Sequence, residues 1–124
     1  MVKILIVEDE RIIAEDLKST LEHEGYLITE IVGLPKQALE SVEKQKPDIA
    51  LVDIKLYGEM TGLDLAVKLK NEYGLAIVFC TAFNDQHTRN KAKKAEPLGY
   101  ITKPIDDLKL VNVIKEAVNK LGLQ

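Results

Sequence analysis

Several short apolar runs of this sequence end in side chains that can carry out chemistry. Glu8 and Asp9 close the first run, Asp53 closes one near the middle, and Thr81 and Lys103 follow two later runs. Each residue alone has an ordinary structural explanation; Asp9, for example, could cap a helix. No single structural reason, however, explains why three carboxylates, a hydroxyl and an ammonium all stand at the ends of apolar runs. Together they indicate a chemical site.

The charges of these residues suggest what the site would need. If Glu8, Asp9 and Asp53 lie close together, their carboxylates raise one another's pKa and oppose folding, and Lys103 offsets only one of them. A hard divalent cation resolves this conflict, and two carboxylates with waters are usual for Mg²⁺. Asp53 beside the metal would be a nucleophile that forms an aspartyl-phosphate. Lys103 and the Thr81 hydroxyl would stabilise the oxygens of the transferred phosphoryl group.

Alternating apolar runs and amphipathic segments must position these residues. The apolar runs predict strands over 2–7, 27–33, 48–53, 75–80 and 98–102, the second of them more polar and therefore at a sheet edge. The segment after Asp9 predicts a helix with Ile13, Leu17 and Leu21 inward, and further helices are predicted over 35–46, 62–73, 84–95 and 106–121. The last helix is expected to bury Leu121, and the helix over 84–95 is polar and marginal.

This alternation predicts an α/β fold with a parallel sheet covered by helices on both faces. Periodicity fits either common doubly wound strand order, and a set of five strands favours the flavodoxin-like (βα)5 order 2-1-3-4-5. In such a sheet the ligand site lies beyond the carboxyl ends of the strands, at the switch point between strands 1 and 3. The first of these strands ends in Glu8 and Asp9, and the other ends in Asp53.

Composition narrows the class of protein. The 124 residues fit one domain, and a net charge of −3 gives no general attraction to nucleic acid or anionic lipid. No apolar run approaches the roughly 20 residues that span a bilayer. The single Cys80 cannot form an internal disulfide, which suits a reducing compartment. We therefore expect a cytoplasmic protein that binds neither nucleic acid nor membrane directly.

Four motifs resemble the receiver domain of two-component signalling, the response-regulator family. They are Ile-Val-Glu-Asp-Glu at 6–10, Asp-Ile-Ala-Leu-Val-Asp at 48–53, Thr-Ala at 81–82 and Tyr-Ile-Thr-Lys-Pro at 100–104. Any one alone is weak evidence, but their order and spacing together are specific. The resemblance covers essentially all of residues 1–124, which we expect to form one receiver domain.

The resemblance assigns a role to each site residue. It implies that Asp53 accepts a phosphoryl group from a sensor histidine kinase or a histidine phosphotransfer protein. Glu8 and Asp9 would serve Mg²⁺ together with Asp53 and the backbone carbonyl of Lys55. Such a domain is a phosphorylatable switch rather than an enzyme, with at most self-phosphorylation and autodephosphorylation activity.

The remaining matching residues have roles in the switch itself. By resemblance, Lys103 binds the phosphate and its peptide bond to Pro104 is cis, Thr81 is the switch hydroxyl, and Tyr100 is the switch aromatic. Phosphorylation would draw the Thr81 hydroxyl inward and let the Tyr100 ring rotate into the vacated space. The surface of the fourth helix, fifth strand and fifth helix would then change, which would control a downstream protein or an output domain. Dimerisation through that surface on phosphorylation is a further prediction.

Two stretches depart from the family pattern. Tyr57 replaces a proline often found after the acceptor, in a loop that is one residue longer than usual, and Pro97 interrupts the end of the fourth helix. Beside the site, bulky Phe83 and long Lys55 are expected to slow autodephosphorylation. The last predicted helix ends within three residues of Gln124, so the chain is either a stand-alone receiver or a piece of a longer protein.

Three other functions are alternatives to this one. A haloacid-dehalogenase-type enzyme also forms an aspartyl-phosphate but needs a second Asp where Lys55 stands. A flavin-binding flavodoxin-like protein needs a phosphate loop after the first strand, where the acidic residues 8–10 would repel phosphate. A degenerate receiver would act only as a scaffold, and a phosphorylation assay distinguishes it from a working one.

Overall fold

Five parallel strands form one sheet in the order β2-β1-β3-β4-β5 in the computed structural model, which describes residues 1–56 and 60–123. The strands are β1 (Lys3–Val7), β2 (Leu27–Val32), β3 (Ile49–Val52), β4 (Ala76–Thr81) and β5 (Gly99–Thr102). The helices are α1 (Arg11–His23), α2 (Pro35–Lys44), α3 (Gly62–Tyr73), α4 (Gln86–Ala92) and α5 (Asp107–Lys120), with a 3-10 turn over Lys93–Ala95. The predicted doubly wound fold and strand order are confirmed.

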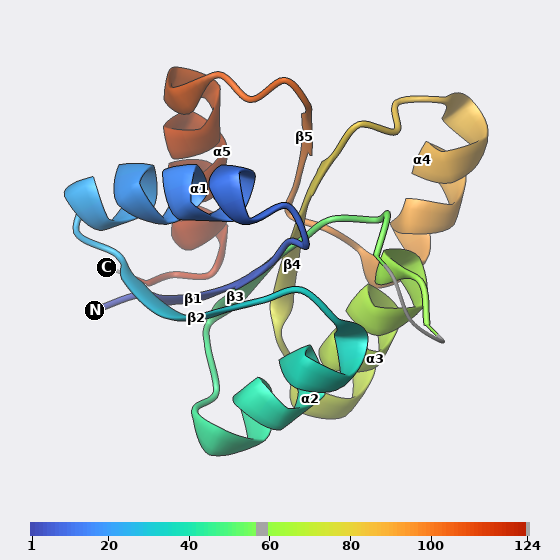
Figure 1. Ribbon diagram of the computed structural model, residues 1–124, viewed down its shortest axis with the longest axis horizontal. Coiled ribbons are helices and arrows are strands. Elements are labelled where there is room, and N and C mark those ends of the chain that lie inside the picture. The colour runs from blue at the N-terminus through green and yellow to red at the C-terminus, as the bar shows by residue number, and fades with distance from the viewer. Residues whose placement is uncertain (57–59, 124) are drawn as a thin grey trace.

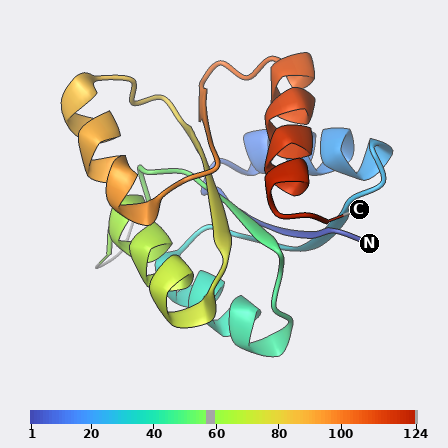
Figure 2. The same ribbon diagram turned by 180° about the vertical axis from the view of Figure 1, so that it is seen from behind.

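Helices cover both faces of the sheet, which separates two apolar clusters. Helices α1 and α5 lie side by side on one face, and α2, α3 and α4 lie on the other (Figures 1 and 2). Ile4 and Ile6 of β1 belong to the cluster under α1 and α5, whereas Leu5 and Val7 belong to the cluster under α2 and α3. This strand is buried on both sides, as its continuous apolar run predicted. Strand β2 forms the predicted sheet edge.

Local capping sets several helix boundaries. The Thr61 hydroxyl accepts a hydrogen bond from the Asp64 N–H at 3.1 Å, and this cap starts α3. Gly74 ends the same helix in the left-handed region, with a φ of 69°. Asp106 caps α5 by accepting from the Leu108 N–H at 2.9 Å. Short polar side chains therefore fix where the chain enters these helices.

The segment predicted as one helix over 84–95 is shorter and divided. Asp85 accepts the Thr88 N–H at 2.9 Å, so α4 begins only at Gln86. The helix ends at Ala92 and tightens into the 3-10 turn. Glu96 then takes a left-handed φ of 44°. The following Pro97 explains this ending, since proline has no N–H to continue a helix and disfavours helical backbone in the residue before it.

The expectation that Leu121 faces the core is wrong. Its side chain is 40% exposed, because α5 ends at Lys120 and the chain turns away there, with Gly122 at a φ of 71°. The predicted departure at Tyr57 lies outside the described residues. Across residues 1–56 and 60–123, none of the helices has the length and apolar character needed to cross a membrane.

Candidate functional site

The carboxyl ends of the strands bring the predicted polar residues to one edge of the sheet. Backbone hydrogen bonds continue the parallel ladder one residue beyond each strand. The Asp53 N–H donates to the Val7 carbonyl at 3.0 Å, and the Lys103 N–H donates to the Thr81 carbonyl at 2.8 Å. These residues are therefore held by the sheet rather than by flexible loops, which gives the site a fixed geometry.

Lys103 lies at the centre of this edge with three carboxylates around its ammonium. Nζ is 2.6 Å from Glu8 Oε1, 2.9 Å from Asp53 Oδ2 and 3.6 Å from Glu10 Oε1. Its single positive charge still offsets only one of the negative charges, as expected, although it contacts three carboxylates. Burial works to lower the pKa of Lys103, but the close carboxylates of Glu8 and Asp53 outweigh it and raise that pKa above its ordinary value. The ammonium stays charged across the physiological range.

Asp53 is buried, and both of its carboxylate oxygens are engaged. Its side chain is 5% exposed. Oδ1 accepts the backbone N–H of Lys55 at 3.1 Å, and Oδ2 accepts from Lys103 at 2.9 Å. The backbone N–H of Lys55 thus lies directly beside the carboxylate, and the role of the Lys55 carbonyl as a metal ligand stays a prediction. These two contacts hold the carboxylate in one orientation, and the Lys103 ammonium supplies the positive charge beside it.

Glu8 is a buried acid with an oxygen that no hydrogen bond satisfies. Its Oε2 accepts the Glu10 N–H at 3.1 Å, whereas Oε1 accepts no hydrogen bond from any residue that the structure describes. The close ammonium of Lys103 meets Oε1 as an ionic contact only. Burial raises the pKa of Glu8 to about 7, against the opposing effect of Lys103. A buried oxygen left in this state is typical of a position that an ion or water completes.

Asp9 and Glu10 complete an acidic group with Glu8. One carboxylate oxygen of each of these three residues lies within 4.8 Å of the others. Asp9 is not the cap of α1, because Glu10 occupies that position and makes no side-chain cap. Sequence reasoning missed Glu10, although the run of three acids after the first strand was a visible signal. The donor set suits a small, hard dication with oxygen ligands.

Thr81 and Tyr100 lie one strand apart on the same side of the sheet. Thr81 ends β4 with no exposed surface, and its hydroxyl accepts the Phe83 N–H at 3.3 Å. Tyr100 is half-buried in β5, and its hydroxyl donates to the Phe83 carbonyl at 2.6 Å. The Tyr100 ring packs at 5.9 Å from the ring of Phe79, its partner in the strand register. The predicted switch pair is therefore linked through one residue of the β4–α4 loop.

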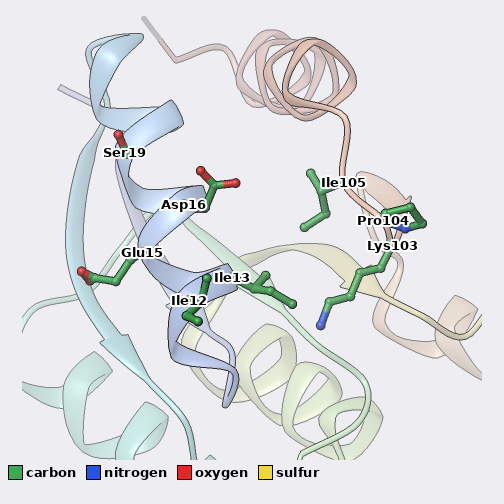
Figure 3. Close-up of a pocket in the computed structure, with 8 residues that line it drawn as sticks. All are labelled: Ile12, Ile13, Glu15, Asp16, Ser19, Lys103, Pro104 and Ile105. Carbon is green, nitrogen blue, oxygen red and sulfur yellow. The ribbon is translucent and has the colours of Figure 1, made fainter.

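An open apolar pocket adjoins the acidic edge. It has a volume of about 510 Å³ and lies between α1 and the loop from β5 to α5. Figure 3 shows Ile13 and Ile105 pointing toward one another across it, with Lys103 extending from the loop toward the start of α1. Ile12 is 88% exposed at the mouth of this pocket. The Lys103–Pro104 peptide bond beside it is cis, as the family resemblance implied.

Comparison with known proteins agrees with this geometry. The response regulator receiver domain family matches residues 4–115, and the chain belongs to that family. It is thus a receiver domain of two-component signalling, a signalling domain rather than an enzyme that turns over a separate substrate. Among the solved structures that share its fold are two receiver domains. The signal receiver domain of a modulated diguanylate cyclase from Desulfovibrio desulfuricans G20 is 36% identical, with a TM-score of 0.88 over 95% of this chain and 94% of that one. A CheY-like receiver domain protein from Methanospirillum hungatei JF-1 is 31% identical, with a TM-score of 0.87 over 97% of this chain and 95% of that one.

Curated relatives are longer than this chain. The transcriptional regulatory protein PdtaR of Mycobacterium tuberculosis is 33% identical over 95% of this chain and 57% of its own length. The sensory transduction protein LytT of Bacillus anthracis is 38% identical over 94% of this chain and 47% of its own length. The chain therefore spans about half the length of the curated relatives it matches.

Proposed function

We propose that the chain is a working phosphorylation switch in which Asp53 accepts the phosphoryl group. The observation that carries this proposal is the setting of Asp53: a buried carboxylate held at 2.9 Å from Lys103 and 3.1 Å from the Lys55 N–H, beside an acidic group with an unsatisfied oxygen. We extend the receiver assignment to residues 1–124 as one domain. The family resemblance and the geometry support the same acceptor.

The proposed reaction moves one phosphoryl group between two side chains. A carboxylate oxygen of Asp53 attacks the phosphorus of a phosphohistidine on a sensor kinase or histidine phosphotransfer protein, the new O–P bond forms, and the P–N bond breaks. The imidazole leaves with the bonding electron pair and takes a proton. Lys103, which already contacts Asp53 at 2.9 Å, would stabilise the negative charge on the transferred group. The Thr81 hydroxyl would become a donor to a phosphoryl oxygen.

Magnesium is the cofactor that this donor set fits. Glu8, Asp9, Asp53 and the backbone carbonyl of Lys55 would hold it, and the unsatisfied Oε1 of Glu8 supports the assignment. When bound, Mg²⁺ neutralises charge on the phosphoryl oxygens as the transfer proceeds. Because burial raises the pKa of Glu8 to about 7, a cation beside it would also favour the ionised form of this acid at neutral pH.

The phosphoryl donor is proposed to dock over the apolar pocket beside Lys103. Any donor must approach Asp53 from this open edge, and the adjoining surface presents Ile12 at 88% exposure together with Ile105. Together with Ile13 and Pro104 they form one apolar patch, and a contiguous exposed apolar patch marks a surface that a partner covers. The helical histidine-bearing segment of a kinase or phosphotransfer protein is the partner we propose here.

Phosphorylation is proposed to act through the Thr81 and Tyr100 pair on the surface of α4, β5 and α5. That surface would bind either a separate target protein or an output domain, and it would also serve a phosphorylation-dependent homodimer. Hydrolysis of the acyl-phosphate would return the switch to its starting state, with Phe83 and Lys55 slowing the reaction. We place this exchange in the cytoplasm, in keeping with the one free, buried cysteine, Cys80.

Intact-mass measurement tests the proposal directly. The protein is incubated with acetyl phosphate and Mg²⁺ beside Asp53→Asn as a control. We expect the wild type to gain one phosphoryl group and the variant to gain none. Equal modification of both would refute Asp53 as the acceptor. No modification of either, under conditions that phosphorylate another receiver domain, would favour the scaffold function instead.

A further inference from the structure

Glu10 is an acid beside the candidate site to which the proposed function gives no role. It occupies the cap position of α1, but its side chain makes no capping hydrogen bond. That side chain is 64% exposed, and its Oε1 lies 3.6 Å from the Lys103 ammonium. One of its carboxylate oxygens also lies within 4.8 Å of an oxygen of Glu8 and of Asp9. The carboxylate therefore faces the acidic edge of the sheet and not its own helix.

The backbone holds Glu10 in this place. Its N–H donates to Glu8 Oε2 at 3.1 Å, so the exposed acid and the buried acid are fixed relative to one another. The next residue, Arg11, forms its ion pair with Glu15 at 3.4 Å. Among residues 1–56 and 60–123, Lys103 is the only cation within ion-pair distance of Glu10.

The charges at this edge do not balance. Four carboxylates share it with one ammonium, and these five side chains belong to Glu8, Asp9, Glu10, Asp53 and Lys103. When all are ionised they leave three negative charges uncompensated, as many as the net charge of −3 of the whole chain. Like charges this close oppose folding unless a cation compensates them. Glu10 adds to this excess although it has no capping role.

The buried oxygen of Glu8 independently indicates a cation at the same place. The Glu8 side chain is 2% exposed, and its Oε1 accepts no hydrogen bond in the described part of the chain. A dication that binds Glu8 and Asp9 would lie close to the Glu10 carboxylate, because the three groups lie within 4.8 Å of one another. Opposite charges about 5 Å apart attract strongly even in water, whereas a charge beyond the Debye length of about 8 Å is largely screened.

We propose that Glu10 is an outer acid of the magnesium site and sets how tightly the cation binds. The inference rests on the proposed function, in which Glu8 and Asp9 help to hold Mg²⁺. Because Mg²⁺ keeps several waters when it binds a protein, an exposed carboxylate beside it accepts hydrogen bonds from those waters and adds its charge to the site. Glu10 is thus a positioning residue: it attracts and orients the hydrated ion, while the proposed ligands contact the ion directly.

The test compares Glu10→Gln with Glu22→Gln, a matched loss of one negative charge from an exposed position at the other end of α1. Electron paramagnetic resonance counts free Mn²⁺, competition gives the Kd of Mg²⁺, and neither measurement needs phosphorylation. We expect Glu10→Gln to weaken the binding of both ions about three- to tenfold at low ionic strength. Glu22→Gln should bind them as the wild type does, and Glu10→Asp should retain most of the affinity. Equal affinities in the two glutamine variants would overturn the proposal.

Salt separates an effect of charge from an effect of structure. Circular dichroism in a chelating buffer first shows that each variant is folded. The difference between Glu10→Gln and Glu22→Gln should then shrink as KCl rises from about 0.05 to about 0.5 M, because salt screens exposed charges. A difference that ignores salt would also overturn the proposal. If the ions bind as expected but Asp53 accepts no phosphoryl group, the proposed function fails while the role of Glu10 stands.

Discussion

Gly62 packs directly against the backbone of Asp53: a Cβ added at Gly62 would lie 2.0 Å from the Asp53 carbonyl oxygen and 2.7 Å from the Cα of Ile54. The Gly62 N–H also donates to the Ile54 carbonyl at 3.0 Å. The first residue of α3 therefore sets the position of the segment that carries the proposed acceptor, and only glycine fits there.

Substitution of Gly62 by alanine should therefore damage both stability and phosphorylation. The methyl group must displace backbone, which costs about 2 kcal/mol of unfolding free energy, and the displacement moves Asp53. The two measurements are unfolding in urea and the rate of phosphorylation by acetyl phosphate. Gly122→Ala is the control, since a Cβ added there meets open space and the alanine would be strained only by the φ of 71°. A normal phosphorylation rate in Gly62→Ala would show that α3 does not position the acceptor.

Glu8→Gln should stabilise the metal-free protein at neutral and alkaline pH. The pKa of Glu8 is raised from 4.5 to about 7, so the folded state holds this proton more tightly than the unfolded chain. The stability that protonation contributes is fully present below pH 4.5 and is lost as pH rises through about 7. Relative to the wild type, the variant should gain at most about 3 kcal/mol across this range.

Urea unfolding in a chelating buffer at several pH values measures that gain. Added Mg²⁺ should then stabilise the wild type more than Glu8→Gln, because the variant has lost an anionic oxygen of the proposed metal site. An equal response of both proteins to Mg²⁺ would exclude Glu8 as a ligand. If the difference in unfolding free energy between the two proteins did not change with pH, burial would not disfavour the Glu8 charge.

Lys103→Met should destabilise the metal-free protein by about 3 kcal/mol, because removing one partner of a buried ion pair leaves the other charge uncompensated. Here two buried carboxylates lose their ammonium at once, Glu8 at 2.6 Å and Asp53 at 2.9 Å. Thermal unfolding measures the loss, with exposed Lys109→Met as control. Phosphorylation by acetyl phosphate should also slow in Lys103→Met. Wild-type rates in this variant would remove Lys103 from the proposed transfer.

Phe83→Glu should shorten the lifetime of the phosphorylated protein. The Phe83 side chain is 40% exposed, and its backbone N–H contacts the Thr81 hydroxyl, so it lies beside the route of a hydrolytic water. A carboxylate there would orient that water, whereas a bulky apolar ring excludes it. Decay of the acyl-phosphate is followed after removal of acetyl phosphate, with Phe83→Leu as the apolar control. Equal decay in wild type and Phe83→Glu would contradict this role.

The sequence predicted the strands and the site residues where local signals were strong. Continuous apolar runs gave β1 and β3, and the rule that parallel strands share one carboxyl edge brought Glu8, Asp53 and Lys103 together. Their contacts could not be predicted in the same way. The reach of a long Lys103 side chain to three carboxylates, including the unassigned Glu10, depends on packing between segments that are 50 to 95 residues apart in sequence.

The other differences between the predicted and the observed structure lie at helix ends. Periodicity extends a helix until a breaker appears, so it missed the later start that the Asp85 cap defines and the tight 3-10 turn before Pro97. Leu121 fits the apolar spacing of α5 but follows its last turn, where spacing no longer determines burial. The contact of Arg89 with Tyr100 had no sequence signal, because a lone arginine on a polar helix is usually solvated.

The sheet separates two apolar clusters, one beneath α1 and α5 and the other beneath α2, α3 and α4. Ile13 and Ile105, which line the pocket beside Lys103, pack on the first cluster, whereas Tyr100 packs on the second. A protein that covers this pocket would thus lie on the α1 and α5 face, whereas a protein that contacts Tyr100 and α4 would lie on the opposite face (Figure 1). Because the proposed output surface also includes α5, that helix is where the two partners would meet, and mutations on α4 can suit a new target protein without altering the pocket.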